Sequence, residues 1–368
     1  DSKNTKIDGK INFKNLFGNE NQSFLMNGNF NNLSSSFDNL TAMLPNVLGK
    51  KLPAELKKLG SFSIIGSTTV SKTALTADFS LNTEIGKVQS VLKMNSIDFI
   101  DKASYAGNIV LVDFNVGELL GSEDLGMVSM NIDVDGKGFT EKYLNTELKG
   151  DITQIDFKKY TYTNVVVNGN FKAPNYTGQI SVNDPNLSMN FDGLVDLRNT
   201  ENKYDFHINV ENSDLHKLNL VSDPISKFKG DVLVQVTGNT IENLQGNVYI
   251  QKTSYENEKD VYIFDDFNIA SQFDKDRVRT ITVNSPDIVE GEIVGKFQFN
   301  QLGNLIRNSL GSLYTNFKPN KVNKGQFLKF DFTIYNKIIE IFYPEMSIGT
   351  NTVVSGNIKS DSQEFKLN

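Results

Sequence analysis

The chain has no cysteine, no tryptophan and only two histidines among its 368 residues. Without cysteine there is neither a disulfide framework nor a thiolate metal site. The absence of cysteine does not decide in which cellular compartment the protein works. His207 on the polar side of a predicted strand and His216 in a predicted turn lack the spacing of metal ligands. No Gly-x-Ser-x-Gly elbow is present either, so a nucleophilic triad lacks its usual parts. We therefore expect no catalytic residue, no metal and no cofactor, and predict that the protein is not an enzyme.

Positive charge and long apolar runs are also scarce. Lys and Arg number 37 against 44 Asp and Glu, which gives a net charge of −7 and a pI of about 5.1. This balance disfavours a nucleic-acid partner, because nucleic acids are bound by clustered cations. No run approaches the roughly 18–20 apolar residues of a membrane-spanning helix. The chain starts at Asp1 without a visible signal peptide, so we expect part of a longer or processed protein, with any membrane anchor outside this segment.

Apolar and polar residues alternate along most of the chain. The pattern is clearest in residues 128–135, 187–198 and 328–335, where Val, Ile, Leu, Met and Phe alternate with Ser, Asn, Asp and Lys. A period of two is typical of a β-sheet with one solvated and one apolar face. Few apolar residues in so long a chain (38 %) favour a thin structure over a thick core.

Turn residues separate these segments closely. Asp135-Gly136, Asn168-Gly169, Asp184-Pro185 and Asp192-Gly193 are typical turn pairs. Strands joined by short turns pair with their sequence neighbours as antiparallel meanders. We predict a mostly β fold: an elongated antiparallel meander, coiled into an open groove, with strands of mostly 5–8 residues. About 25 strands at roughly 4.8 Å each would extend on the order of 120 Å.

Two segments have helical spacing instead. Leucines recur in residues 33–59, where Pro45 and Pro53 divide the segment, and in residues 301–314; a weaker helical turn covers 116–120. We interpret these segments as amphipathic covers or plugs of the apolar face. They mark three blocks: residues 1–60 with the first strands and a helical cover, 61–300 with a continuous β-groove, and 301–368 with a helical plug and further strands. Because no low-complexity linker divides the chain, we expect one continuous elongated domain.

Asp133, Asp135 and Gly136 form half of a calcium-loop pattern. An EF-hand loop needs further oxygen ligands and a Glu at its twelfth position, which are missing. We interpret the two carboxylates as the polar side of a strand and Gly136 as the start of a turn.

The apolar face therefore carries the functional prediction, because a long exposed apolar strip would aggregate. A second sheet packed on it would make a β-sandwich or a repeat adhesin, whereas an open trough could hold acyl chains. Each buried methylene contributes about 0.8 kcal/mol, so a tail of roughly 16 carbons gains on the order of 13 kcal/mol. The pattern alone leaves both readings open. The residues predicted to line the face are Leu75, Phe79, Leu81, Leu92, Met94, Val128, Met130, Ile132, Val134, Val165, Val167, Phe171, Leu187, Met189, Phe191, Val195, Phe206, Ile208, Val210, Val232, Val234, Val236, Ile281, Val283, Phe297, Phe299, Phe330, Phe332 and Ile334.

A family resemblance favours the trough. Several stretches, in this order, resemble an internal part of the TamB proteins of the Bacteroidota, within the TamB and AsmA-like superfamily. They are Leu56–Gly60, Asp113–Gly121, Asp124–Ser129, Tyr160–Tyr162 with Val165–Gly169, Asp184–Leu187 with Phe191–Asp196, Leu215–Leu220, and Ile293–Phe297 before an amphipathic helix. The resemblance covers about residues 40–320. Each motif alone has low specificity, and the order of the motifs along the chain is the stronger evidence for the resemblance.

The resemblance implies a periplasmic β-taco groove between an inner-membrane anchor and an outer-membrane barrel of the Omp85 family, TamA or a relative. The superfamily resembles the eukaryotic bridge-like lipid transfer proteins, so the expected function is a conduit that carries phospholipid between the membranes. A scaffold for the assembly of outer-membrane β-barrel proteins is the alternative, and a repeat β-sandwich adhesin is the third. Neither the anchor nor the barrel-binding region can be placed on these residues.

Overall fold

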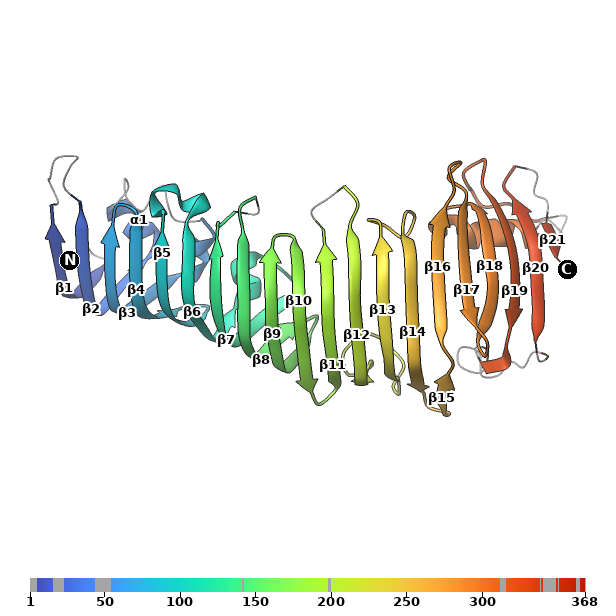
Figure 1. Cartoon of the computed structure of the whole chain (residues 1–368), viewed down its shortest axis with the longest axis horizontal. Helices are drawn as coiled ribbons and strands as arrows, with labels where there is room; N and C mark the ends of the chain where they lie inside the picture. The colour runs from blue at the N-terminus through green and yellow to red at the C-terminus, as the bar shows by residue number, and fades with distance from the viewer. Residues whose placement is uncertain are drawn as a thin grey trace. The chain divides into compact units, whose positions relative to one another are not determined.

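The computed structural model describes residues 5–15, 23–43, 54–140, 142–197, 200–311, 316–337, 339, 349, 351–361 and 365–367. These residues form a mostly β structure: one long, open antiparallel meander sheet with three short α-helices (Figure 1). The predicted fold class is confirmed. The chain divides into two compact units, Asp1–Asn190 and Phe191–Asn368, with the boundary inside the predicted 61–300 block.

In the first unit, each strand from β1 to β10 pairs antiparallel with the next one in sequence. Hairpin connections produce this order because short turns bring sequence neighbours together. The strands are β1 Lys6–Lys14, β2 Leu25–Ser36, β3 Ser61–Ser71, β4 Ala74–Thr83, β5 Gly86–Asn95, β6 Ser104–Asn115, β7 Leu125–Lys137, β8 Asn145–Phe157, β9 Tyr160–Lys172 and β10 Asn175–Asp184.

The second unit continues the same pattern. Its strands are β12 Lys203–Asp214, β13 Lys227–Thr237, β14 Gln245–Glu256, β15 Val261–Phe264, β16 Phe267–Phe273, β17 Arg279–Ser285, β18 Val289–Lys296, β19 Phe327–Ile334, β20 Thr352–Lys359 and β21 Phe365–Leu367, while β11 Leu187–Asp196 contains the unit boundary. The described residues form 21 strands, which occupy 20 successive positions in the sheet because β15 and β16 both pair with β14.

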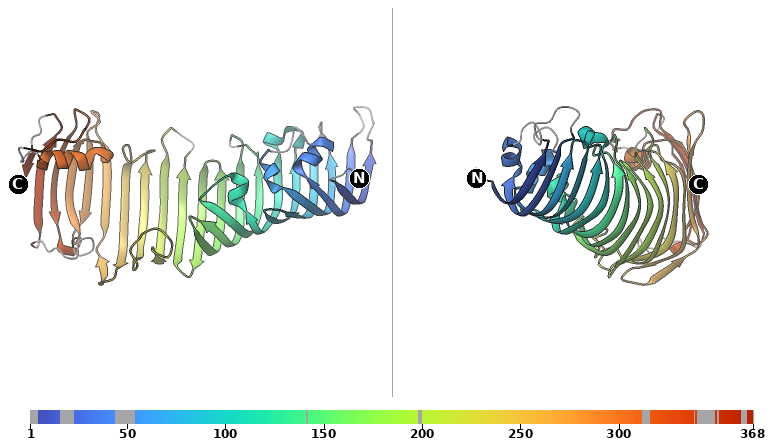
Figure 2. Two further views of the ribbon diagram at one scale, coloured as in Figure 1. Left: turned by 180° about the vertical axis from the view of Figure 1, so that it is seen from behind. Right: turned by 60° about the vertical axis from the view of Figure 1, so that its left-hand side comes forward.

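Many strands are longer than the sequence pattern predicted. Strands β7, β8 and β9 each contain 13 residues, against the expected 5–8. Part of the reason is the β-bulge: the pairing of β7 with β8 shifts register between Leu125 and Val128 and between Ser129 and Met130. Similar shifts lie in β6 and in β12. A bulge restarts the alternation, so one bent strand looks like two short ones in the sequence. Figure 2 shows the resulting curvature of the strands in the first unit.

The helical predictions are confirmed in part. Helix α2, Val116–Leu120, has the predicted bounds, and α3, Phe299–Gly311, covers most of the predicted 301–314 segment. In the 33–59 segment the prediction is wrong for residues 33–36, which belong to β2 because Leu33 pairs with Ile64. Helix α1, Phe37–Met43, and the 3-10 helix η1, Ala54–Leu59, form the helical part. A second 3-10 helix, η2, spans Ile97–Lys102, and residues 44–53 and 312–314 lie outside the described residues.

Candidate functional site

The predicted lining residues of the first unit share one face of the sheet. Residues directly opposite each other in an antiparallel ladder point to the same side. Val167 on β9 lies opposite both Ile180 and Gly150, and Gly150 lies opposite Ile132, which in turn lies opposite Ile109. The alternation in five neighbouring strands therefore builds a single apolar face.

Three overlapping clusters of apolar side chains lie along this face. Adjacent clusters share half-buried members: Ile109 and Met130 belong to the first and second, and Leu148 and Ile152 to the second and third. The apolar contacts are therefore continuous from β5 to the start of β11. The buried members are Leu59, Ile85, Leu111 and Phe114 in the first cluster, Tyr105, Ile132 and Val134 in the second, and Val165, Val167 and Val182 in the third.

The second unit has an apolar face of the same kind. Val234 lies opposite Phe206, whose ring centroid is 5.3 Å from that of Phe191. Further along the sheet, Ile281 lies opposite Ile293. The predicted residues of this unit are thus brought together as a row across neighbouring strands.

None of the predicted lining residues is exposed. The buried ones are Val128, Ile132, Val134, Val165, Val167 and Ile281. All the others are half-buried: Leu75, Phe79, Leu81, Leu92, Met94, Met130, Phe171, Leu187, Met189, Phe191, Val195, Phe206, Ile208, Val210, Val232, Val234, Val236, Val283, Phe297, Phe299, Phe330, Phe332 and Ile334. In the described part of the chain, most of this face is shielded by neighbouring side chains and still reachable by solvent.

Phe297 and Phe299 reach their positions differently from the prediction, which placed both on a strand. Strand β18 ends at Lys296, Phe297 follows it, and Phe299 is the first residue of α3. Their rings meet edge to face with centroids 5.4 Å apart. The alternation continued past the strand end in the sequence, so it gave no sign of this boundary.

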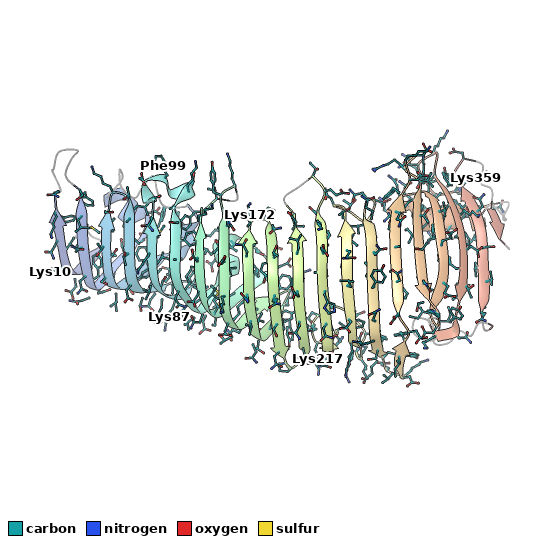
Figure 3. The ribbon with its side chains drawn as sticks, viewed as in Figure 1. Lys10, Lys87, Phe99, Lys172, Lys217 and Lys359 are labelled. Atoms are coloured by element: carbon teal, nitrogen blue, oxygen red, sulfur yellow. The ribbon has the colours of Figure 1, made fainter. Side chains whose placement is uncertain are left out.

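Polar side chains hydrogen bond to one another across the opposite face. The Asn108 amide donates to Asn131 Oδ1 at 2.7 Å and to Asp133 Oδ1 at 2.9 Å. Asp133 and Asp135 are exposed members of β7, as the strand interpretation predicted, while Gly136 still belongs to the strand and does not begin a turn. Lysines such as Lys87 and Lys172 project from the sheet into solvent (Figure 3).

A few apolar side chains also lie on the polar face. Ile65, Val91, Val166 and Leu233 are exposed, with exposed fractions of 37–52 %. Leu233 lies opposite His207, next to Val234 in the chain but on the other side of the sheet. Neighbouring positions of similar hydrophobicity therefore experience very different surroundings, which supplies matched pairs for experiments.

Arg279 is a charged residue on the apolar face that the sequence reasoning missed. It precedes Ile281 by two residues, at the start of β17, and its exposed fraction is 5 %. Its Nε donates to Ser271 Oγ at 2.9 Å, and its two terminal nitrogens donate to the carbonyl oxygens of Ile241 and Leu244 at 2.8 Å. The available signal was its position two residues before Ile281, because residues two apart on a strand point to the same face.

Aromatic rings and one carboxylate surround this guanidinium. Its central carbon is 5.1 Å from the ring centroid of Phe273 and 4.8 Å from that of Phe299. Burial lowers the pKa of Arg279, while the charge of Glu242 acts in the opposite direction. The Glu242 carboxylate also accepts the backbone N–H of Phe299 at 2.9 and 3.1 Å. Arg279 thus places a fixed positive charge at the margin of the apolar face.

Asp184 occupies a similar position in the first unit, two residues beyond Val182, and is 5 % exposed. It accepts hydrogen bonds from the Tyr160 hydroxyl, the Thr163 backbone N–H at 3.0 Å, the Thr163 hydroxyl at 2.9 Å and the Asn186 backbone N–H at 2.8 Å. Burial opposes ionisation, but these hydrogen bonds prevail and lower the pKa of Asp184. The carboxylate thereby fixes the β10–β11 turn.

Helical segments pack on the apolar face, as predicted. Leu59 of η1 and Val116 and Leu119 of α2 belong to the first cluster. In the second unit, Leu305 of α3 forms a cluster with Leu328 and Ile358. The left view of Figure 2 shows α3 crossing in front of the strands near the C-terminal end of that unit.

The described residues contain no group of three or more His, Cys, Asp or Glu side chains placed to hold a metal ion. The Nε2 of His207 is 3.6 Å from Asp231 Oδ1, and His216 is exposed. Within the described part of the chain, no helix has the length and hydrophobicity needed to cross a membrane.

Comparison with known proteins adds no relative: no family model, no curated protein and no solved structure matches the chain.

Proposed function

We propose that the chain is a lipid-binding segment of a TamB-like conduit of the cell envelope, in which phospholipid tails contact the apolar face of the sheet. In this proposal the segment lies in the periplasm, between an inner-membrane anchor elsewhere in the protein and an outer-membrane barrel of the Omp85 family. It performs no covalent chemistry.

The observation that carries the proposal is the partial burial of the apolar face within each unit. Large side chains such as Phe79, Met189 and Phe332 are half-buried, and the described strands belong to one open sheet with short helices. A packed sandwich core would bury such residues almost completely. We therefore place the sandwich adhesin last among the candidates.

The chemistry of the face suits acyl chains. Covering it with lipid tails removes apolar area from water at about 25 cal/mol per Å² on both partners. The face offers several similar apolar rows rather than one deep pocket, so a tail can exchange one row for the next at little cost. The polar groups of the opposite face keep the sheet solvated.

Photocrosslinking tests the proposal directly. Benzoylphenylalanine replaces either Phe206, on the apolar face, or His207, its exposed neighbour on the polar face. After incubation with phosphatidylethanolamine vesicles and irradiation, we expect lipid adducts by mass spectrometry at position 206 and few at 207. Equal labelling at both positions, or none at 206, would overturn the lipid-binding assignment.

A charge pair separates the conduit from the assembly scaffold. Val234→Glu places a carboxylate on the apolar face, whereas Leu233→Glu adds the same charge to the polar face. We expect Val234→Glu to lower bound phospholipid by a factor of about ten or more, because a carboxylate among tails costs several kcal/mol, while Leu233→Glu binds as the wild type does. A scaffold that uses only backbone edges predicts no difference between the variants.

A further inference from the structure

A cavity of about 390 Å³ opens in the second unit beside Arg279. Four basic residues and no acidic residue line it: Arg277, Arg279, Lys296 and Lys324. Phe273 and Phe297 supply its aromatic wall, and amide side chains and glycines complete it. In a chain with a net charge of −7, this is a local concentration of positive charge.

The four cations come from different elements and differ in mobility. Arg279 is buried and held by three acceptors, so it is a fixed charge. Arg277 lies in the turn before β17, with its guanidinium 5.4 Å from the Phe273 ring centroid. Lys296 ends β18, and Lys324 lies in the turn before β19; both are exposed. The turns thus bring three exposed cations around a fixed fourth one.

Nearby carboxylates, including Glu242 beside Arg279, accept backbone N–H groups. Asp274 Oδ1 accepts the backbone N–H groups of Asp276 and Val278, each at 2.8 Å. Asp361 Oδ1 accepts the Gly325 N–H at 3.0 Å. Among the described residues, no carboxylate forms an ion pair with the three exposed cations that line the cavity. Their charge is therefore available to an external anion.

We propose that this cavity binds an anionic phosphate group, and that the group is the headgroup phosphate of a lipid whose tails lie on the apolar face. Converging Lys and Arg side chains recognise phosphate through charge-assisted hydrogen bonds. The aromatic wall joins the cavity to that face, because Phe297 also packs in the Leu305, Leu328 and Ile358 cluster. Phosphate recognition stands on the cavity alone, whereas the lipid source rests on the proposed function.

Calorimetric titration tests the site with two probes, dihexanoyl phosphatidylglycerol and inorganic phosphate. The double variant Arg277→Gln and Lys324→Gln removes two of the lining charges and leaves buried Arg279 in place. The matched control, Lys149→Gln and Lys172→Gln, removes the same charge from exposed strand positions of the first unit. We expect phosphatidylglycerol to bind about tenfold more weakly to the double variant and normally to the control.

Each other outcome is decisive. Equal binding of phosphatidylglycerol by the wild type and the double variant overturns the headgroup site, and leaves the conduit intact if position 206 still crosslinks lipid. Binding of inorganic phosphate alone, lost in the double variant, keeps a phosphate site and excludes the lipid source. Binding of neither probe by the wild type overturns the whole inference.

Discussion

At the residue scale, Asp184 and Arg279 show how charges are accommodated at the margins of an apolar face. A buried charge is costly unless hydrogen bonds replace its hydration. Asp184 has four donors and Arg279 has three acceptors, and four of these seven partners are backbone groups. Both residues stand at strand ends, where backbone groups are free to supply these partners.

The Asp184 carboxylate should contribute to stability in a pH-dependent way. Asp184→Ala leaves the Tyr160 hydroxyl and the Thr163 N–H without their acceptor, and should cost about 2–4 kcal/mol at pH 7. The pKa of Asp184 is lower in the folded chain than its ordinary value of 3.8, so its stabilisation is present above that value and is lost as the pH falls.

Urea unfolding of the wild type and of Asp184→Ala at pH 7 and pH 3 measures this difference. The gap between the two proteins should be smaller at pH 3. A gap that is unchanged or larger at pH 3 would show that the ionised carboxylate is not the stabilising species.

At the element scale, the short helices are accessories of the sheet. Helix α3 buries Leu305, which is 2 % exposed, against Leu328 and Ile358, while Ile306 and Leu310 remain exposed. A helix of 13 residues has marginal stability in isolation, so this packing is what holds it. Its removal should affect the strands beneath it.

Two substitutions in α3 should act in opposite directions. Leu305→Ala should destabilise the second unit by about 2–5 kcal/mol, because it empties a buried site. Gly303→Ala should stabilise it by about 1 kcal/mol, since Gly303 is exposed and an added methyl group would meet nothing within 4 Å. Urea unfolding checks both, and equal shifts in one direction would contradict the helical packing.

The sequence predicted elements well where one period held over their length. Val116–Leu120 was found within its bounds because Asn115 caps it and Gly121 ends it in a left-handed conformation. Residues 33–36 were misassigned because they directly precede leucines at helical spacing, which begin at Leu40, whereas pairing with β3 decided their conformation. Bulges inside β6 and β12 hid the full strand lengths for the same reason: they depend on the partner strand.

At the scale of the whole molecule, the described contacts are mainly between sequence neighbours. Within each unit, nearly every strand pairs with the strand before and after it, as in repeat proteins. Stability in such arrays is close to a sum of local interactions, so a local defect should stay local.

Hydrogen exchange measured by mass spectrometry tests this locality. Leu305→Ala should raise exchange in β18 to β20, next to α3, and leave β6 to β9 of the first unit unchanged. Gly303→Ala serves as a control in the same helix and should not raise exchange. A uniform increase over both units would show that the chain unfolds as one cooperative body.

The sequence by itself determined the two faces of the sheet, since the side-chain period of a strand is fixed by its backbone geometry. It also determined the meander, because short turns bring sequence neighbours together. Only the tertiary structure decided where strands bend, which residues of the apolar face are fully covered, and that Arg279 stands beside Lys296 and Lys324. These features depend on pairing register and on contacts between distant residues, which local sequence does not encode.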